Sequence, residues 1–407
     1  MELPRAWVVE GWFDGEERHE SGPATLTVEG GILTAVESAD HGAALAARGM
    51  TVERAAYLIP GLVDAHVHLF LDGSMTNAVE RSAHLKQPVE VLTETARRNA
   101  RAAQMQGVTW VRDAGDRFGI NNAIRAEARQ RPDRLAQVRS GGIGIKRPKR
   151  YGAFIATDVV DEADITRCVS ELAAVNDEIK LILSGIIDFN AGAVTDAPQF
   201  TAAETRLVVE EARRHGRRVF AHCSGVDGLA AAVQAGVGSI EHGFFMTSAI
   251  LEIMAEKGIA WTPTFCPVHF QWAHPGLAGW SPAAVDNLRR ILDRHAEQLL
   301  LAQRLGVRLL LGTDAGSMGV VHGGAVLLEM ERFREAGLPM QATLSAATAN
   351  ARRQFGHTHP RLAKGAPFDA VLLNASPFRN AEALRLPSAV WSCGGPVNID
   401  RGTPTGR

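Results

Sequence analysis

Several residues of the kinds that bind metal ions occur at the ends of apolar segments of this chain. His66 and His68 are two positions apart in LVDAHVH, a spacing that directs both imidazole rings to one side of a β-strand. Further candidates of the same kind follow later in the chain: Lys180, His222, His242 and Asp314. Imidazole and carboxylate groups are ligands of zinc and other divalent ions, so this set predicts a metal site.

Each of these residues has a simpler explanation when it is taken alone. A single histidine at a strand end is more often a structural residue than a ligand, and an aspartate before Ala-Gly is more often a turn residue. The combination favours the metal site, because chance would have to place all six side chains at the same end of one fold. We therefore expect a metal centre built from several elements.

Lys180 allows two interpretations, because a protonated ammonium cannot bind a metal and is costly in the apolar segment EIKLILSG. In the first, the long side chain reaches solvent or an ion pair. In the second, burial lowers its pKa, the neutral amine adds CO₂, and the resulting carbamate binds two cations that hold a hydroxide between them. Only six of the chain's 43 basic residues are lysines, and guanidinium cannot form this carbamate.

These side chains need a scaffold that brings distant segments together. From residue 62 onward, apolar strands alternate with amphipathic helices, the pattern of a parallel sheet. The candidate strands are residues 62–68, 108–115, 135–142, 178–185, 218–225, 237–243, 259–264 and 307–316. Eight such strands predict a (β/α)₈ TIM-like barrel, whose active site lies at the carboxyl ends of the strands.

The two ends of the chain lack this alternation of strands and helices. Short β-type runs with turn signals fill residues 5–59, and short strands return after Gly365. We expect a small β-sandwich domain formed by residues 1–59 and 365–407, and a (β/α)₈ barrel carrying the metal site formed by residues 60–364.

Composition limits the classes of partner. The formal net charge is −2, which argues against nucleic acid and anionic membranes as partners. The N-terminal segment lacks the pattern of a secretory signal, and four widely spaced cysteines favour buried free thiols over disulfides. We expect a cytoplasmic protein with a small-molecule substrate, and the sequence leaves open whether it forms a homo-oligomer.

Seven segments together resemble the binuclear-metal amidohydrolases, especially imidazolonepropionase-like proteins and metal-dependent dipeptidases of the Xaa-Pro and Xaa-Arg type. The segments are PGLVDAHVH (60–68), IKLILSG (179–185), VFAHCSG (219–225), SIEHG (239–243), LGTDAG (312–316), VHGG (321–324) and AATANARRQFG (346–356). The resemblance implies one metal held by His66, His68, carboxylated Lys180 and Asp314, and a second held by Lys180, His222 and His242. It also implies zinc as the ion.

The same resemblance implies how a carbon–nitrogen bond would be cleaved. A metal-bridging hydroxide attacks the carbonyl carbon, the second metal polarises the carbonyl oxygen, and Asp314 moves the proton to the leaving nitrogen. His242 serves this catalytic centre as well. The alternatives are a mononuclear deaminase or hydrolase with an unmodified Lys180, and a non-catalytic scaffold of the same family.

The substrate is less well defined than the metal site. An amide, lactam, urea or carbamate fits the chemistry, with N-acyl amino acids and dipeptides among the candidates. The loop GIGIKRPKRYGAF and Ser224 stand where the dipeptidase-like branch has other residues, which argues against a dipeptide. The candidate substrate contacts are Lys146, Tyr151, Ser224, His269 in the aromatic loop 264–280, and His322.

Overall fold

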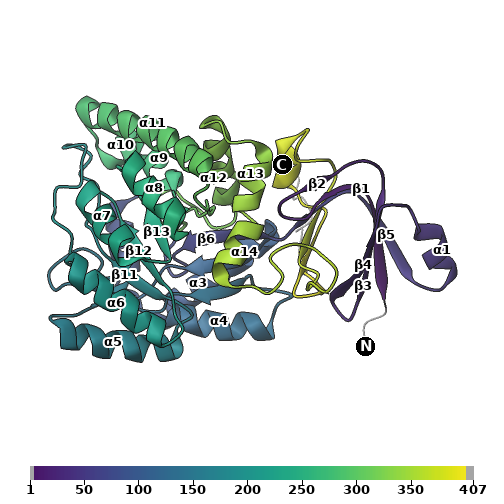
Figure 1. Ribbon diagram of the computed structural model, residues 1–407, viewed down its shortest axis with the longest axis horizontal. Helices are drawn as coiled ribbons and strands as arrows, with labels where there is room; N and C mark the ends of the chain where they lie inside the picture. Colours follow the sequence, from purple (N-terminus) through teal and green to yellow (C-terminus); the bar gives the residue numbers. More distant parts are fainter. Residues whose placement is uncertain (1–3, 400–407) are drawn as a thin grey trace.

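The computed structural model describes residues 4–399 and contains the predicted parallel barrel with its surrounding helices (Figure 1). Seven of its strands pair in parallel with their neighbours: β6 (Leu62–Val67), β7 (Val108–Asp113), β8 (Gln137–Ser140), β11 (Ile179–Ile182), β12 (Val219–Cys223), β13 (Ser239–His242) and β14 (Ala260–Thr262). Each corresponds to a segment expected from the sequence. The predicted fold class is therefore confirmed.

The eighth predicted strand, residues 307–316, closes the barrel as an irregular segment. It pairs in parallel through single bridges, Trp261 with Leu309 on one side and Val67 with Ala315 on the other. The backbone N–H of Leu311 donates to the carbonyl of Ala346, outside the barrel, at 3.1 Å. Because part of its hydrogen bonding is directed elsewhere, the segment holds its place between β14 and β6 without forming a continuous ladder.

An extra strand precedes β11 in the barrel sheet. It is β9 (Gly144–Lys146), which follows β8 in the chain and pairs with β11 through Ile145 and Leu181. A further strand, β10 (Ala156–Asp158), pairs with β9 at the edge. The third βα connection thus joins the sheet before α5 begins.

The helices that cover the barrel follow the signals in the sequence. They are α3 (Val89–Met105), α4 (Ile120–Gln130), α5 (Glu162–Val175), α6 (Ala202–Arg214), α7 (Val226–Ala235), α8 (Ser248–Lys257), α11 (Pro282–Leu305) and α12 (Gly324–Glu335). The spacing Thr201-x-x-Glu204 predicts a capping box at the start of α6, and it is present, since the two residues exchange hydrogen bonds.

Two segments differ from what the sequence predicts. The expected loop 264–280 contains two short helices, α9 (Phe265–Ala273) and α10 (Pro275–Ala278). The pattern PMQATLSAATANARRQFG predicts a single helix over residues 339–356, but the structure divides it into α13 (Met340–Ala346) and α14 (Ala349–Phe355). The break occurs where the carbonyl of Ala347 accepts the backbone N–H of Val63 at 2.7 Å, so tertiary contact with β6 interrupts the helical pattern.

Strands from both ends of the chain form one separate sheet. It contains β1 (Arg5–Phe13), β2 (Arg18–His19), β3 (Ala24–Glu29), β4 (Ile32–Glu37), β5 (Thr51–Pro60), β15 (Ala370–Leu373), β16 (Ala389–Ser392) and β17 (Gly395–Pro396). The two ends meet where β5 pairs with β15. Trp7, Phe368 and Trp391 pack together in a hydrophobic cluster of this sheet. The sheet lies beside the barrel (Figure 1).

Two further expectations concern membranes and thiols. Within residues 4–399, no helix is both long and apolar enough to cross a membrane. Cys168, Cys223 and Cys266 are buried free thiols, as expected, whereas Cys393 is exposed because it lies in the turn between β16 and β17.

Candidate metal centre

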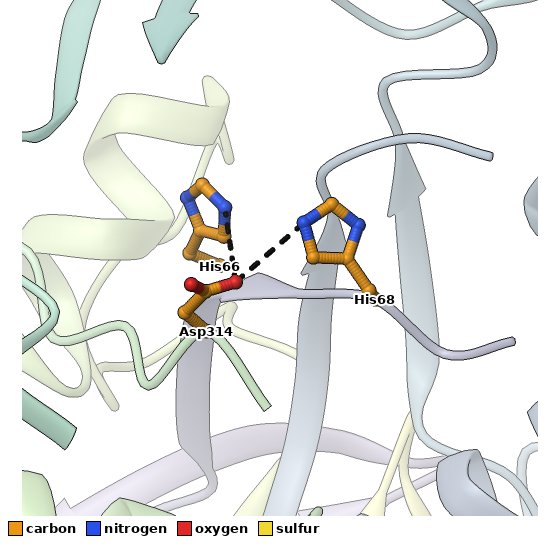
Figure 2. Close-up of side chains that lie close together, drawn as sticks. All are labelled: His66, His68 and Asp314. Carbon is orange, nitrogen blue, oxygen red and sulfur yellow. Dashed lines mark ion pairs between the residues drawn. The ribbon is translucent and has the colours of Figure 1, made fainter. Parts of the chain in front are cut away.

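The side chains at the ends of β6 and the eighth segment meet at one mouth of the barrel. The Nε2 atoms of His66 and His68 lie 3.7 and 3.5 Å from Oδ1 of Asp314 (Figure 2). One ligand atom from each of the three residues fits within a group no wider than 4.8 Å. Figure 2 shows the two rings and the carboxylate turned toward one another, the arrangement of a cation site.

The remaining predicted ligands gather on the other side of this group. The ring centre of His242 lies 4.9 Å from that of His66 and 4.5 Å from that of His222. Lys180 points inward from β11, with its Nζ atom 4.9 Å from the centre of the Phe220 ring. The structure therefore brings together all six residues that the sequence singled out as ligands.

Three buried nitrogen atoms in this cluster have no hydrogen-bond partner within the described chain: His66 Nε2, Lys180 Nζ and His222 Nε2. Burying a polar atom without a partner is unfavourable, so these atoms indicate a group that the protein alone does not supply. Burial, together with the charge of Lys180, lowers the pKa of His68 and of His222 to about 3. Neutral imidazoles with free lone pairs are the form that binds metal.

Burial also shifts the pKa values of the two groups that carry charge here. It lowers the pKa of Lys180 to about 8, against the favourable charge of Glu241, which makes the neutral amine accessible near neutral pH. It raises the pKa of Asp314 to about 7, against the opposing effect of Lys180. Asp314 and the three partnerless nitrogens, one of which is Nζ of Lys180, fit the donor set of a divalent-metal centre.

The backbone is strained at three residues of the site. His242, Thr264 and Asp314 have φ values of 68°, 52° and 56°, in the left-handed region that β-branched residues such as threonine rarely adopt. The hydroxyl of Thr264 lies 2.8 Å from Nδ1 of His242 and fixes the orientation of that ring. This strain is located where the strand ends turn their side chains into the mouth.

Glu241 is a functional residue that the sequence analysis missed. It is fully buried, and its Oε2 atom accepts a hydrogen bond from Nδ1 of His66 at 2.7 Å, which leaves Nε2 of that ring free to face a cation. Its other oxygen accepts from Arg112 at 2.6 Å and from Ser239 at 2.6 Å. The sequence did contain a signal: a charged residue lies inside each of two buried parallel strands, Glu241 in SIEHG and Arg112 in VTWVRDAG.

Asp64 forms its hydrogen bonds with neighbouring backbone and hydroxyl groups and with no histidine ring of the site. Its carboxylate accepts hydrogen bonds from the backbone and hydroxyl of Thr313, at 2.9 and 2.6 Å, and from the backbone of His66 at 3.3 Å. Burial raises its pKa to about 7. Asp64 thereby joins β6 to the segment that carries Asp314.

A cavity of about 390 Å³ opens beside the cluster. Two of the predicted substrate contacts, Tyr151 and Ser224, line it, and the Tyr151 ring lies 5.2 Å from the ring of His222. Most of the other walls are apolar: Leu71, Met75, Leu85, Phe154, Ile155, Ile186, Ile187, Phe189, Phe244, Pro267, Val268 and Met318. Two of them, Pro267 and Val268, come from α9, so the aromatic segment 264–280 does contribute to the wall.

The other three predicted substrate contacts do not line this cavity. The ammonium of Lys146 is buried against the carboxylate of Asp158 at 2.5 Å, because β9 and β10 pair side by side. Nε2 of His269 lies 2.6 Å from the guanidinium of Arg332, on the far side of α9. His322 is buried after the eighth segment, and burial lowers its pKa to about 4.

Comparison with known proteins places this geometry in a family context. The model of the amidohydrolase family matches residues 57–394. An uncharacterized protein of Mycobacterium tuberculosis is 28% identical over 346 residues, 84% of this chain and 85% of that protein. Ochratoxinase of Aspergillus niger is 33% identical over 197 residues, 47% of this chain and 40% of that enzyme.

Solved structures of the same fold cover almost the whole chain. The crystal structure of A. niger ochratoxinase aligns with a TM-score of 0.81 and 23% identity, covering 97% of this chain and 96% of that chain. A Xaa-Pro dipeptidase with methionine bound in its active site aligns with a TM-score of 0.80 and 21% identity, covering 97% and 99%. At this identity the likeness establishes the fold.

Proposed function

Because this chain belongs to the amidohydrolase family, we propose that it is a metal-dependent hydrolase that cleaves a carbon–nitrogen bond in an amide, lactam, urea or carbamate. One observation carries the proposal: His66, His68 and Asp314 bring their ligand atoms together beside a substrate-sized cavity that Lys180, His222 and His242 line. Such a donor set is costly to bury unless a cation completes it.

We assign the ligands to two ions, with zinc as the expected metal. His66, His68, Lys180 and Asp314 would hold the first ion, and Lys180, His222 and His242 the second. Lys180 would join them as a carbamate: its neutral Nζ forms a bond to the carbon of CO₂ and releases a proton. When bound, the ions would supply polarisation of a carbonyl oxygen and acidification of a water molecule.

The remaining steps fall to the chain's own residues. Asp314 takes the proton of the attacking water and passes it to the leaving nitrogen, and Ser317 orients its carboxylate by donating to Oδ2 at 3.1 Å. Tyr151 and Ser224 contact the substrate from the cavity wall, and the apolar walls exclude bulk water from the reacting amide.

A mononuclear deaminase or hydrolase is the second candidate. The observation in its favour is Nζ of Lys180 over the Phe220 ring, a position that also suits an unmodified ammonium. A non-catalytic scaffold agrees less well with the site, because every ligand type expected for two metals is present at the mouth. A cytoplasmic location and a small-molecule partner remain predictions.

Hydrolysis of a panel containing N-acyl amino acids, dipeptides, lactams, aryl ureas and carbamates tests the proposal. We expect turnover of at least one class, its loss on metal chelation, and its recovery when Zn²⁺ is restored. Lys180→Ala should abolish turnover and reduce the bound metal. Full activity of Lys180→Ala with two ions bound would contradict the assigned ligands.

A further inference from the structure

The cavity beside the metal centre contains one cation that the proposed ligands do not include. Arg81, on α2 (Ala78–His84), lines the cavity with a half-buried side chain. The other lining residues outside the metal centre are mostly apolar. Burial lowers the pKa of Arg81 below its ordinary value, against the favourable charges of Asp314 and Asp72.

Within residues 4–399, no carboxylate lies within ion-pair distance of the Arg81 guanidinium. Asp72, the nearest lining acid on the same connection, is engaged by Arg98 at 2.9 Å and by the hydroxyl of Ser74 at 2.6 Å. Arg81 instead donates to three backbone carbonyls, those of Asp72, Met75 and Gly316, at 3.2, 3.1 and 2.8 Å. Of its five N–H groups, the one on Nε and one of the two on Nη2 remain for another acceptor.

The guanidinium is held next to the residue proposed to move the proton. Gly316, which accepts from Arg81, belongs to the turn in which the backbone of Ser317 donates to Asp314 at 3.1 Å. The contact with Gly316 places the guanidinium on this turn, and the contacts with Asp72 and Met75 tie it to the connection before α2. An anionic group bound there would therefore lie close to the metal centre.

We propose that Arg81 binds a carboxylate of the substrate, so that the preferred substrates combine a carboxylate near the scissile amide with a large apolar group. This inference rests on the proposed hydrolase function and narrows it to carboxylated amides such as N-acyl derivatives of apolar amino acids. A charge-assisted bond from arginine to carboxylate would satisfy the remaining N–H groups. The apolar walls would take the rest of the molecule.

A matched pair of substrates separates carboxylate binding from a purely structural role of Arg81. N-benzoyl-phenylalanine and N-benzoyl-2-phenylethylamine both release benzoate and differ only in the carboxylate. We expect wild type to prefer the acid. Arg81→Gln should lower kcat/KM for the acid by roughly 10- to 100-fold, whereas kcat/KM for the neutral amide should change less than about threefold. Arg81→Lys, which keeps the charge, should retain part of the preference.

The control is Arg97→Gln, which removes a guanidinium that pairs with Glu127 on the outside of the barrel and does not line the cavity. It should leave both rates unchanged. An equal loss for both compounds in Arg81→Gln would show a structural role and overturn the inference. Equal turnover of both compounds by wild type would overturn it as well, while leaving the hydrolase function intact.

Calorimetric binding of N-benzoyl-phenylalanine to the metal-loaded protein covers the case in which neither compound is hydrolysed. Binding to wild type that weakens about 10-fold or more in Arg81→Gln would support the carboxylate site even if the hydrolase function failed on this panel. Equal affinity of wild type and Arg81→Gln for N-benzoyl-phenylalanine would overturn the carboxylate site.

Discussion

Replacing Glu241 with glutamine tests how the barrel interior prepares His66 for a cation. The carboxylate of Glu241 accepts three short hydrogen bonds, from His66 at 2.7 Å, from Arg112 at 2.6 Å and from Ser239 at 2.6 Å. Glutamine has nearly the same shape but offers only one oxygen. Its NH₂ group would face one of these donors, so either the His66 ring or the Arg112 side of the network would lose its acceptor.

The magnitude follows from complete burial. Glu241, Arg112 and His66 are all fully inaccessible to solvent, so the loss of the charge leaves a buried guanidinium with a weaker partner. Breaking a buried ion pair costs about 3–5 kcal/mol in the free energy of unfolding. Loss of a carboxylate that orients a metal-binding histidine lowers metal affinity by about 10- to 100-fold.

Two assays measure these effects separately: chelator competition gives the dissociation constant of Zn²⁺, and thermal denaturation of the metal-free protein gives stability. Glu178→Gln is the matched control, because Glu178 is also buried and lies 3.5 Å from Arg112 but makes no contact with His66. We expect both variants to lose stability and only Glu241→Gln to lose metal affinity. Equal Zn²⁺ affinities in Glu241→Gln and wild type would refute the reasoning.

Two further predictions concern stability. Burial raises the pKa of Glu329 to about 7 from an ordinary 4.5, so its contribution to the stability of the metal-free protein is full below pH 4.5 and is lost as pH rises through 7. Glu329→Gln should therefore reduce the pH dependence of the unfolding free energy over this range. An unchanged pH dependence would contradict the argument. A Cβ at Gly73 would lie 1.9 Å from the carbonyl oxygen of Val320, whereas one at Gly324 would meet nothing within 4 Å. Gly73→Ala should therefore lower the melting temperature by several degrees, corresponding to about 1–3 kcal/mol, and Gly324→Ala should not; equal melting temperatures of the two variants would contradict the packing argument.

The barrel and the ligand positions were predictable because both follow from local rules. Parallel strands alternate with helices at regular spacing, and the fold collects the carboxyl ends of its strands at one mouth. His66 in β6 and His68 just after it both direct Nε2 toward Asp314, as their spacing predicted. The irregular eighth segment could not be foreseen, because its hydrogen bonds to Ala346 depend on where the later helices pack.

Glu241 was missed because strand alternation fails at its neighbour. Side chains at successive strand positions point to opposite sides, so Glu241 and His242 should not both face the site. A φ of 68° at His242 redirects its ring, and both side chains reach His66. Local backbone strain of this kind is set by tertiary contacts and leaves little trace in the sequence.

The substrate contacts were harder to predict than the ligands because they lie on loops. Tyr151 reaches the cavity, whereas Lys146, only five positions earlier, is held by Asp158 on the neighbouring strand. His269 turned out to lie on α9, where its ring faces Arg332. Residue type identified candidates on these loops, but the direction of each side chain depended on the path of the loop.

The metal content of the purified chain, measured by mass spectrometry on a protein sample of known concentration, tests the central claim most directly. The ligand set of His66, His68, Lys180, His222, His242 and Asp314 predicts close to two divalent ions per chain. One ion per chain would favour the mononuclear alternative. A correctly folded protein that binds no metal, even after incubation with Zn²⁺ and bicarbonate, would contradict the account.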